Sequence, residues 1–223
     1  MAKGAYFRPE FFAFLSELKA HNDRDWFQAN KARYEEFVRD PFLRLIADLA
    51  PGFREIDSRV VVDPSPNRGS MFRIYRDTRF SADKTPYKTH VAAHFRMAGA
   101  SAGTVPGYYL HFEPGESMIG GGVWHPEPRA VQKIRAGIVE RSKEWEKVRS
   151  GVTLIGETLK RPPAGYRAEH PLIEDLKRKD FAAVLPVSEE EVLGARLEKV
   201  LIGRFKKIAP FVSFLDAALR GRV

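Results

Sequence analysis

The spacing of apolar residues changes twice along this chain of 223 residues, and that change limits the folds it can adopt. Residues 8–50 repeat apolar side chains every three or four positions, which is typical of amphipathic helices. Residues 53–124 alternate apolar and polar side chains, which predicts strands. Residues 126–220 return mostly to the helical spacing. Helices and strands in separate blocks predict an α+β fold.

Turn-forming residues predict where the strands and helices end. We expect strands near residues 54–62, 71–76, 88–97, 107–113 and 116–124, and a further one over 180–186. Their short spacing favours antiparallel pairing, because parallel neighbours need long crossovers. Pro51-Gly52 should end a helix, Pro210 should begin the last one, and Ser188 with Glu191 fits a capping box.

No internal repeat and no long linker interrupts this pattern. We therefore expect one domain over residues 1–223, with a central, mainly antiparallel sheet packed by the N-terminal and C-terminal helices.

The composition excludes several classes of chemistry. The chain has no cysteine, so it forms no disulfide, thiolate zinc site or iron–sulfur cluster and has no thiol nucleophile. No apolar run approaches the roughly eighteen residues that a membrane-spanning helix needs, and no targeting signal is visible. We expect a soluble, cytoplasmic protein that does not act at a membrane.

Positive charge is concentrated in the middle of the chain. The formal net charge is +8, and residues 67–96 alone carry seven Lys and Arg against two Asp, an excess of five. A concentrated basic patch attracts anions, whereas dispersed charge mainly aids solubility.

Alternation along the predicted strands sorts their side chains between two faces. The set predicted to face the core is Phe72, Ile74, Thr89, Val91, Ala93, Phe95, Tyr108, Leu110 and Phe112. The set predicted on the opposite face is Arg73, Tyr75, Asp77, Lys88, His90, His94, Arg96, Tyr109, His111 and Glu113. If the strands pair with their apolar faces aligned, the second set forms one polar surface.

That surface suits a phosphate group, because Arg offers a planar fork, Lys a point charge, and Tyr and His further hydrogen bonds. The candidate ligand-binding residues are Arg73, Tyr75, Arg76, Arg79, Lys84, Tyr87, Lys88 and His90. His90 and His111 are the candidates for proton transfer if the protein is a catalyst. The alternative is that Arg76–Asp77 and Asp83–Lys84 are internal ion pairs that hold the loop without any ligand.

Two further patterns have a functional and a structural interpretation. His90, His94 and His111, with Glu113, are of the residue types that bind metals, but Lys88 and Arg96 crowd the same face, and we expect no metal there. The run Gly120-Gly121-Gly122 can present amides to an anion; we favour a turn with positive φ angles instead.

Residues 72–89, FRIYRDTRFSADKTPYKT, resemble the signature of a widespread family of conserved hypothetical proteins with a domain of unknown function. The resemblance extends over about residues 7–219, through the segments NDRDWF (22–27), GYYLHFEP (107–114), GGGVW (120–124) and PAGY (163–166). It implies a single intracellular domain and carries over no activity.

The leading hypothesis is binding of an anionic, phosphate-bearing ligand, either a small molecule or a nucleic acid, on the basic strand-and-loop surface. The alternatives are a metal-assisted phosphoester hydrolase and a non-catalytic scaffold that contacts a protein partner. The sequence leaves open which of these applies, and whether any cofactor takes part.

Overall fold

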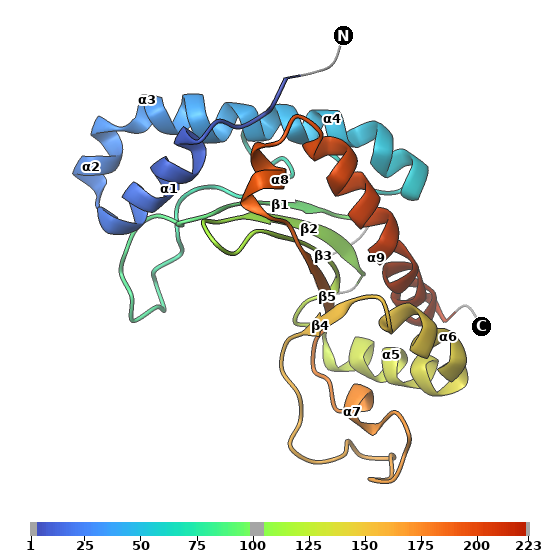
Figure 1. The fold of residues 1–223 in the computed structure, drawn as a ribbon. Coiled ribbons are helices and arrows are strands. Elements are labelled where there is room, and N and C mark those ends of the chain that lie inside the picture. The colour runs from blue at the N-terminus through green and yellow to red at the C-terminus, as the bar shows by residue number, and fades with distance from the viewer. Residues whose placement is uncertain (1–3, 99–104, 222–223) are drawn as a thin grey trace. The chain divides into compact units, whose positions relative to one another are not determined.

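The computed structural model describes residues 4–98 and 105–221 (Figure 1). The chain forms two compact units, each assembled from separated stretches. Unit 1 draws on Met1–Phe95, Tyr109–Ile119 and Pro186–Gly203; unit 2 draws on Arg96–Tyr108, Gly120–Leu185 and Arg204–Val223. The expectation of one domain over residues 1–223 stays a prediction.

The elements follow one another in the helix–strand–helix order expected from the sequence. The helices of the first block are α1 (Glu10–Ala20), α2 (Arg24–Ala29), α3 (Lys31–Tyr34), the π-helix η1 (Glu35–Arg39) and α4 (Asp40–Ile56). The strands are β1 (Val91–Phe95), β2 (Gly107–Phe112), β3 (Met118–Val123), β4 (Thr153–Ile155) and β5 (Phe181–Pro186). The remaining helices are α5 (Pro128–Glu140), α6 (Ser142–Arg149), α7 (Ile173–Leu176), α8 (Glu189–Leu193) and α9 (Leu197–Arg220).

The five strands form one sheet in the order β1-β2-β3-β5-β4. β4 pairs antiparallel with β5, with Thr153 opposite Val184 and Ile155 opposite Ala182. An antiparallel sheet with helices before and after it in the chain confirms the α+β class.

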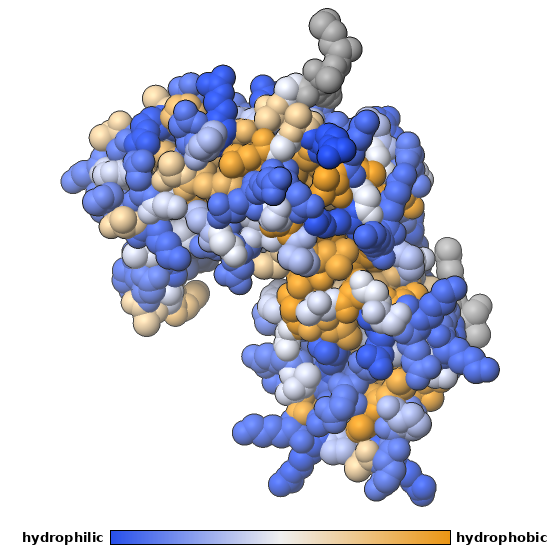
Figure 2. Space-filling model, viewed as in Figure 1, coloured by the Kyte–Doolittle hydropathy of each residue, from blue (hydrophilic) through white to orange (hydrophobic). Residues whose placement is uncertain are grey.

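In unit 1, aromatic side chains join α1 and α4 to the sheet. Phe112 of β2 receives the edges of Phe7, Phe11 and Phe42, with ring centroids 5.7, 6.2 and 5.8 Å away. Phe53 of α4 packs on Phe95 of β1 at 4.6 Å. The apolar stripe predicted for α1 is buried. Hydrophilic side chains dominate the surface of α1 to α4 that Figure 2 displays, as expected for helices with one buried face.

In unit 2, Trp145 of α6 is the centre of the core. Its side chain is fully buried against Phe211 and Phe214 of α9, at 5.7 and 5.3 Å, and against Phe181 of β5 at 6.5 Å. Its indole N–H donates to the carboxylate of Asp175, 2.9 Å away. One side chain therefore ties α6, α9, β5 and α7 together.

The predicted strand over 54–62 is wrong, because α4 runs through Pro51-Gly52 to Ile56. A Cβ on Gly52 would lie 2.4 Å from the Cδ1 of Ile202. The glycine therefore serves the close approach of α9 to α4 and does not end the helix.

The prediction that Pro210 begins the last helix is also wrong, since α9 continues through it. Phe205, Ile208 and Phe211 keep one buried stripe across the proline, and that burial outweighs the lost backbone hydrogen bond. The capping box of Ser188 and Glu191 at α8 is confirmed. In the part of the chain that the structure describes, no helix combines the length and apolar character needed to span a membrane.

Two further expectations in the central block are corrected. Residues 71–76 form no regular strand; the isolated bridges Met71–Ala93 and Tyr75–Tyr87, with a few backbone hydrogen bonds, join this segment to the one that follows. Gly120-Gly121-Gly122 lies within β3, as the strand predicted over 116–124 required, and not in a turn, although Gly122 has a positive φ. Glycine is needed at position 122 because a Cβ there would lie 2.1 Å from the carbonyl oxygen of Phe181 on the neighbouring strand β5.

Candidate functional site

Residues 72–89, which carry the family motif, lie in the long connection between α4 and β1. They form a loop that projects from the helices and strands in Figure 1. Its two arms are held side by side by backbone hydrogen bonds, from Arg76 N to Pro86 O (2.9 Å) and from Lys88 N to Ile74 O (2.8 Å). The residues between these bonds form the tip, which we call the signature loop (residues 77–85).

Arg76, directly before this loop, and Arg79 within it are paired internally. The guanidinium of Arg76 donates to the side chains of Asp83 and Thr85, and that of Arg79 lies 2.7 Å from the carboxylate of Asp77. The hydrogen bond from Arg79 lowers the pKa of Asp77 to about 2; the backbone N–H of Thr85 and then Arg76 lower the pKa of Asp83 to about 2. The loop therefore contains ion pairs, but with partners other than Arg76–Asp77 and Asp83–Lys84.

Asn22, between α1 and α2, anchors the end of the loop. Its side-chain amide donates to the carbonyl oxygen of Tyr87 and accepts from the backbone N–H of the same residue, both at 3.0 Å. The Tyr87 ring stacks on Phe27 of α2 at 4.1 Å. No pattern in the sequence indicates this role for Asn22, although Asn22 and Tyr87 both lie in segments that carry the family resemblance.

We expect Asn22→Ala to lower the free energy of unfolding by about 2 kcal/mol, because it removes two hydrogen bonds of about 1 kcal/mol each. Urea denaturation followed by circular dichroism measures this. Asn67→Ala is the matched control, since Asn67 is exposed, and it should change stability by less than about 0.5 kcal/mol. Equal effects of the two substitutions would contradict the anchoring role.

Beside this anchor lies a hollow of about 610 Å³, which we call the basic hollow. Its lining residues are Lys19, Asn22, Arg76, Asp77, Asp83, Thr85, Tyr87, Lys88, Thr89 and His90. Four of the eight predicted ligand-binding residues therefore line it: Arg76, Tyr87, Lys88 and His90.

The other four predicted residues lie elsewhere. Tyr75 lines a smaller hollow of about 350 Å³ together with Arg24, and Lys84 donates to the carbonyl oxygen of Thr78. Arg73 and Arg79 are exposed and are not among the residues that line the basic hollow. Lys19 and Asn22 lie far away in the sequence, in the first helical block, and no local pattern pointed to them.

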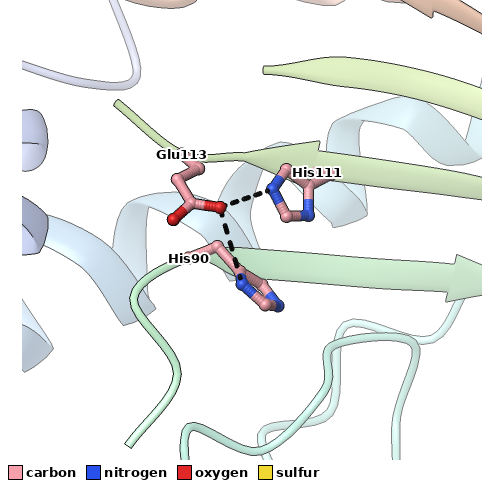
Figure 3. A group of neighbouring side chains, drawn as sticks. All are labelled: His90, His111 and Glu113. Carbon is pink, nitrogen blue, oxygen red and sulfur yellow. Dashed lines mark hydrogen bonds and ion pairs between the residues drawn. The ribbon is translucent and has the colours of Figure 1, made fainter. Parts of the chain in front are cut away.

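Three side chains converge on the polar face of β1 and β2, and we call them the His–His–Glu cluster: His90, His111 and Glu113 (Figure 3). His111 Nε2 lies 3.3 Å and His90 Nδ1 3.9 Å from the same carboxylate oxygen of Glu113. One candidate ligand atom from each residue lies within 4.8 Å of the others. Alternation along β2 and the residue after it placed His111 and Glu113 on one face, and the pairing of β1 with β2 brings His90, the residue before β1, beside them.

Neighbouring hydroxyl groups hold the cluster in place. Thr89 donates from Oγ1 to Glu113 Oε1 at 2.9 Å, and the Tyr109 hydroxyl lies 3.1 Å from His111 Nδ1. Burial lowers the pKa of His90 to about 4, helped by His111, and burial also lowers the pKa of His111. Both imidazoles are therefore neutral near pH 7, and each has a nitrogen lone pair to offer.

Two side chains differ from their predicted positions, and one predicted metal-ligand candidate lies outside the cluster. Thr89 contacts Glu113 on the polar face and not the core, because β1 begins only at Val91 and alternation does not extend back to it. Phe72, predicted to face the core, is 44% exposed and lies parallel to the ring of His94 at 6.4 Å. His94 is not a member of the His–His–Glu cluster.

The fold and these side chains define an α+β protein with a polar cluster on one sheet face beside a basic hollow. A family model, described as conserved hypothetical protein (DUF2461), matches residues 10–214. The chain belongs to this family, as the resemblance of its central motif implied. Comparisons with curated proteins and with solved structures find no match.

Proposed function

We propose that this protein binds a small, phosphate-bearing anion in the basic hollow. The observation that carries the proposal is Lys88. Its side chain is half-buried, and its ammonium donates to the carbonyl oxygen of Arg73 at 2.6 Å and lies over the Phe72 ring, yet it forms no ion pair with a carboxylate of the described residues. Burial and the charge of Arg73 lower the pKa of Lys88. A desolvated cation without a counter-ion gains most from a bound anion.

The rest of the hollow supports the same ligand class. Lys19 adds a second cation that has no carboxylate partner within residues 4–98 and 105–221, and Asn22, Thr85 and Thr89 add polar groups. Asp77 and Asp83 also line the hollow, but their charges are balanced by Arg79 and Arg76. The volume of about 610 Å³ lies in the range of small-molecule sites.

The internal ion pairs separate the predicted ligand-binding residues into those that hold the loop and those that are free to bind a ligand. Arg76 pairs with Asp83 and Arg79 pairs with Asp77, so both arginines already have carboxylate partners. The proposal therefore gives the binding role mainly to Lys88 and Lys19, with His90 as a hydrogen-bonding neighbour.

Calorimetric titration with inorganic pyrophosphate tests the proposal. We expect Lys88→Gln to weaken pyrophosphate binding about tenfold or more, because it removes one charge-assisted hydrogen bond worth about 1.5–3 kcal/mol. Arg96→Gln is the control: it removes a charge from the same basic segment but not from the hollow, and it should leave binding unchanged.

Two outcomes would reject the proposal: wild-type protein that binds no pyrophosphate, or equal affinities of the Lys88→Gln and Arg96→Gln variants. A single-stranded oligonucleotide titrated in parallel decides between the ligand classes. Binding of the oligonucleotide without binding of pyrophosphate would favour nucleic acid and contradict a small-molecule site. Raising the salt concentration should weaken genuine anion binding.

Metal-assisted hydrolysis of a phosphoester is a second candidate function. One observation favours it: His90 both lines the basic hollow and belongs to the His–His–Glu cluster. A metal ion on the cluster would then adjoin a bound phosphate and could activate a water molecule. This function requires a metal ion on the His–His–Glu cluster. If the purified protein retains no zinc, metal-assisted hydrolysis is rejected.

A further inference from the structure

We propose that the His–His–Glu cluster binds a divalent transition-metal ion through one nitrogen each of His90 and His111 and a carboxylate oxygen of Glu113. The inference concerns the cluster alone and does not depend on anion binding in the basic hollow. Two imidazoles and one carboxylate are a ligand set of catalytic zinc sites, and the same set binds other divalent first-row metals.

The separations of the ligand atoms support this assignment. Zinc bonds of about 2.0–2.1 Å in a tetrahedral site place neighbouring ligand atoms about 3.3 Å apart. His111 Nε2 already lies 3.3 Å from the Glu113 oxygen, and His90 Nδ1 lies 3.9 Å from it. One ligand atom from each of the three residues lies within 4.8 Å of the other two, so small side-chain rotations would complete the triangle.

Hydroxyl partners orient the ligands as they do at metal sites. The Tyr109 hydroxyl lies at the far nitrogen of His111, Nδ1, and can accept its N–H while Nε2 binds the metal. Thr89 holds the other oxygen of Glu113 through a 2.9 Å hydrogen bond.

Lys88 and Arg96, which argued against a metal in the sequence, do not join the cluster. The ammonium of Lys88 donates to the Arg73 carbonyl oxygen and lies over the Phe72 ring, and the side chain of Arg96 is exposed. The positive charge of Lys88 lowers the pKa of His90, and the negative charge of Glu113 raises it. Three protein ligands leave at least one coordination position for water or substrate.

Metal retention by the purified protein tests the proposal. The protein is stripped with chelator, loaded with one equivalent of Zn²⁺ in a phosphate-free buffer, desalted and analysed for bound zinc. We expect about one zinc per wild-type chain, and none in the His111→Ala and Glu113→Gln variants. His94→Ala is the matched control, because it removes a histidine from the same strand region outside the cluster and should retain zinc.

Two further readouts separate lost ligation from lost folding. Co²⁺ should give the visible absorption of a low-coordinate site in wild-type protein but not in Glu113→Gln. Zinc should raise the melting temperature of wild-type and His94→Ala protein and leave that of Glu113→Gln unchanged. Glu113→Gln preserves side-chain size and an oxygen for Thr89, so a folded variant is expected.

The proposal is overturned if folded wild-type protein retains no zinc, or if His94→Ala loses as much zinc as His111→Ala. These measurements contain no phosphate, so a negative result says nothing about pyrophosphate binding. Conversely, zinc retention without pyrophosphate binding would reject the proposed function and leave the metal site standing.

Discussion

Trp145→Ala should lower the free energy of unfolding by about 4 kcal/mol, because removing a buried tryptophan leaves a large cavity in the core of unit 2. The substitution removes the contacts with Phe181, Phe211 and Phe214. It also deprives the buried carboxylate of Asp175 of its indole donor at 2.9 Å, leaving Arg149 at 3.1 Å as its nearest ion-pair partner. Urea denaturation followed by far-ultraviolet circular dichroism measures the loss without relying on tryptophan fluorescence.

Trp124→Ala is the matched control for this substitution. Trp124 also belongs to unit 2, but its side chain is 51% exposed. We expect a change of less than about 1 kcal/mol. A Trp145→Phe variant separates the two contributions, because it keeps most of the packing and loses the hydrogen bond. If Trp145→Ala cost no more than Trp124→Ala, the assignment of Trp145 as the centre of this core would be wrong.

Gly122→Ala should lower the free energy of unfolding by about 3 kcal/mol or more. The backbone of Gly122 has a φ of +129°, which non-glycine residues rarely adopt. The new Cβ would also lie 2.1 Å from the Phe181 carbonyl oxygen, and a backbone atom within the sheet cannot easily move away. Strain and overlap therefore add, and each contributes roughly 1–3 kcal/mol.

Gly203→Ala gives a control of opposite sign. Gly203 lies in α9, and a Cβ there would have no heavy atom within 4 Å. Alanine is the better helix former, so this substitution should stabilise the protein by about 0.5–1 kcal/mol. Destabilisation by Gly203→Ala, or a negligible effect of Gly122→Ala, would contradict the local geometry on which both expectations rest.

The candidate site was partly predictable. Alternation along β2 correctly placed Tyr109, His111 and Glu113 on one face, because side chains of a regular strand point to opposite sides in turn. The rule also held one residue beyond a strand end, for His90 and Glu113, but it failed for Thr89 and Phe72, which lie farther from a regular strand. Lys19 and Asn22 were missed for another reason: they reach the basic hollow from the first helical block.

The sequence by itself determined the α+β class, the apolar stripe of α1, the capping box of α8 and the location of the excess charge. The fold class and the stripe depend on the spacing of apolar residues along the chain. The capping box depends on two residues three positions apart, and the charge excess on the number of charged residues in a segment. Only the tertiary structure decided that Arg76 pairs with Asp83, and that His90 meets His111 and Glu113 while His94 does not. Coulomb attraction and metal-binding geometry depend on distances in space, and the pairing of distant segments sets those distances.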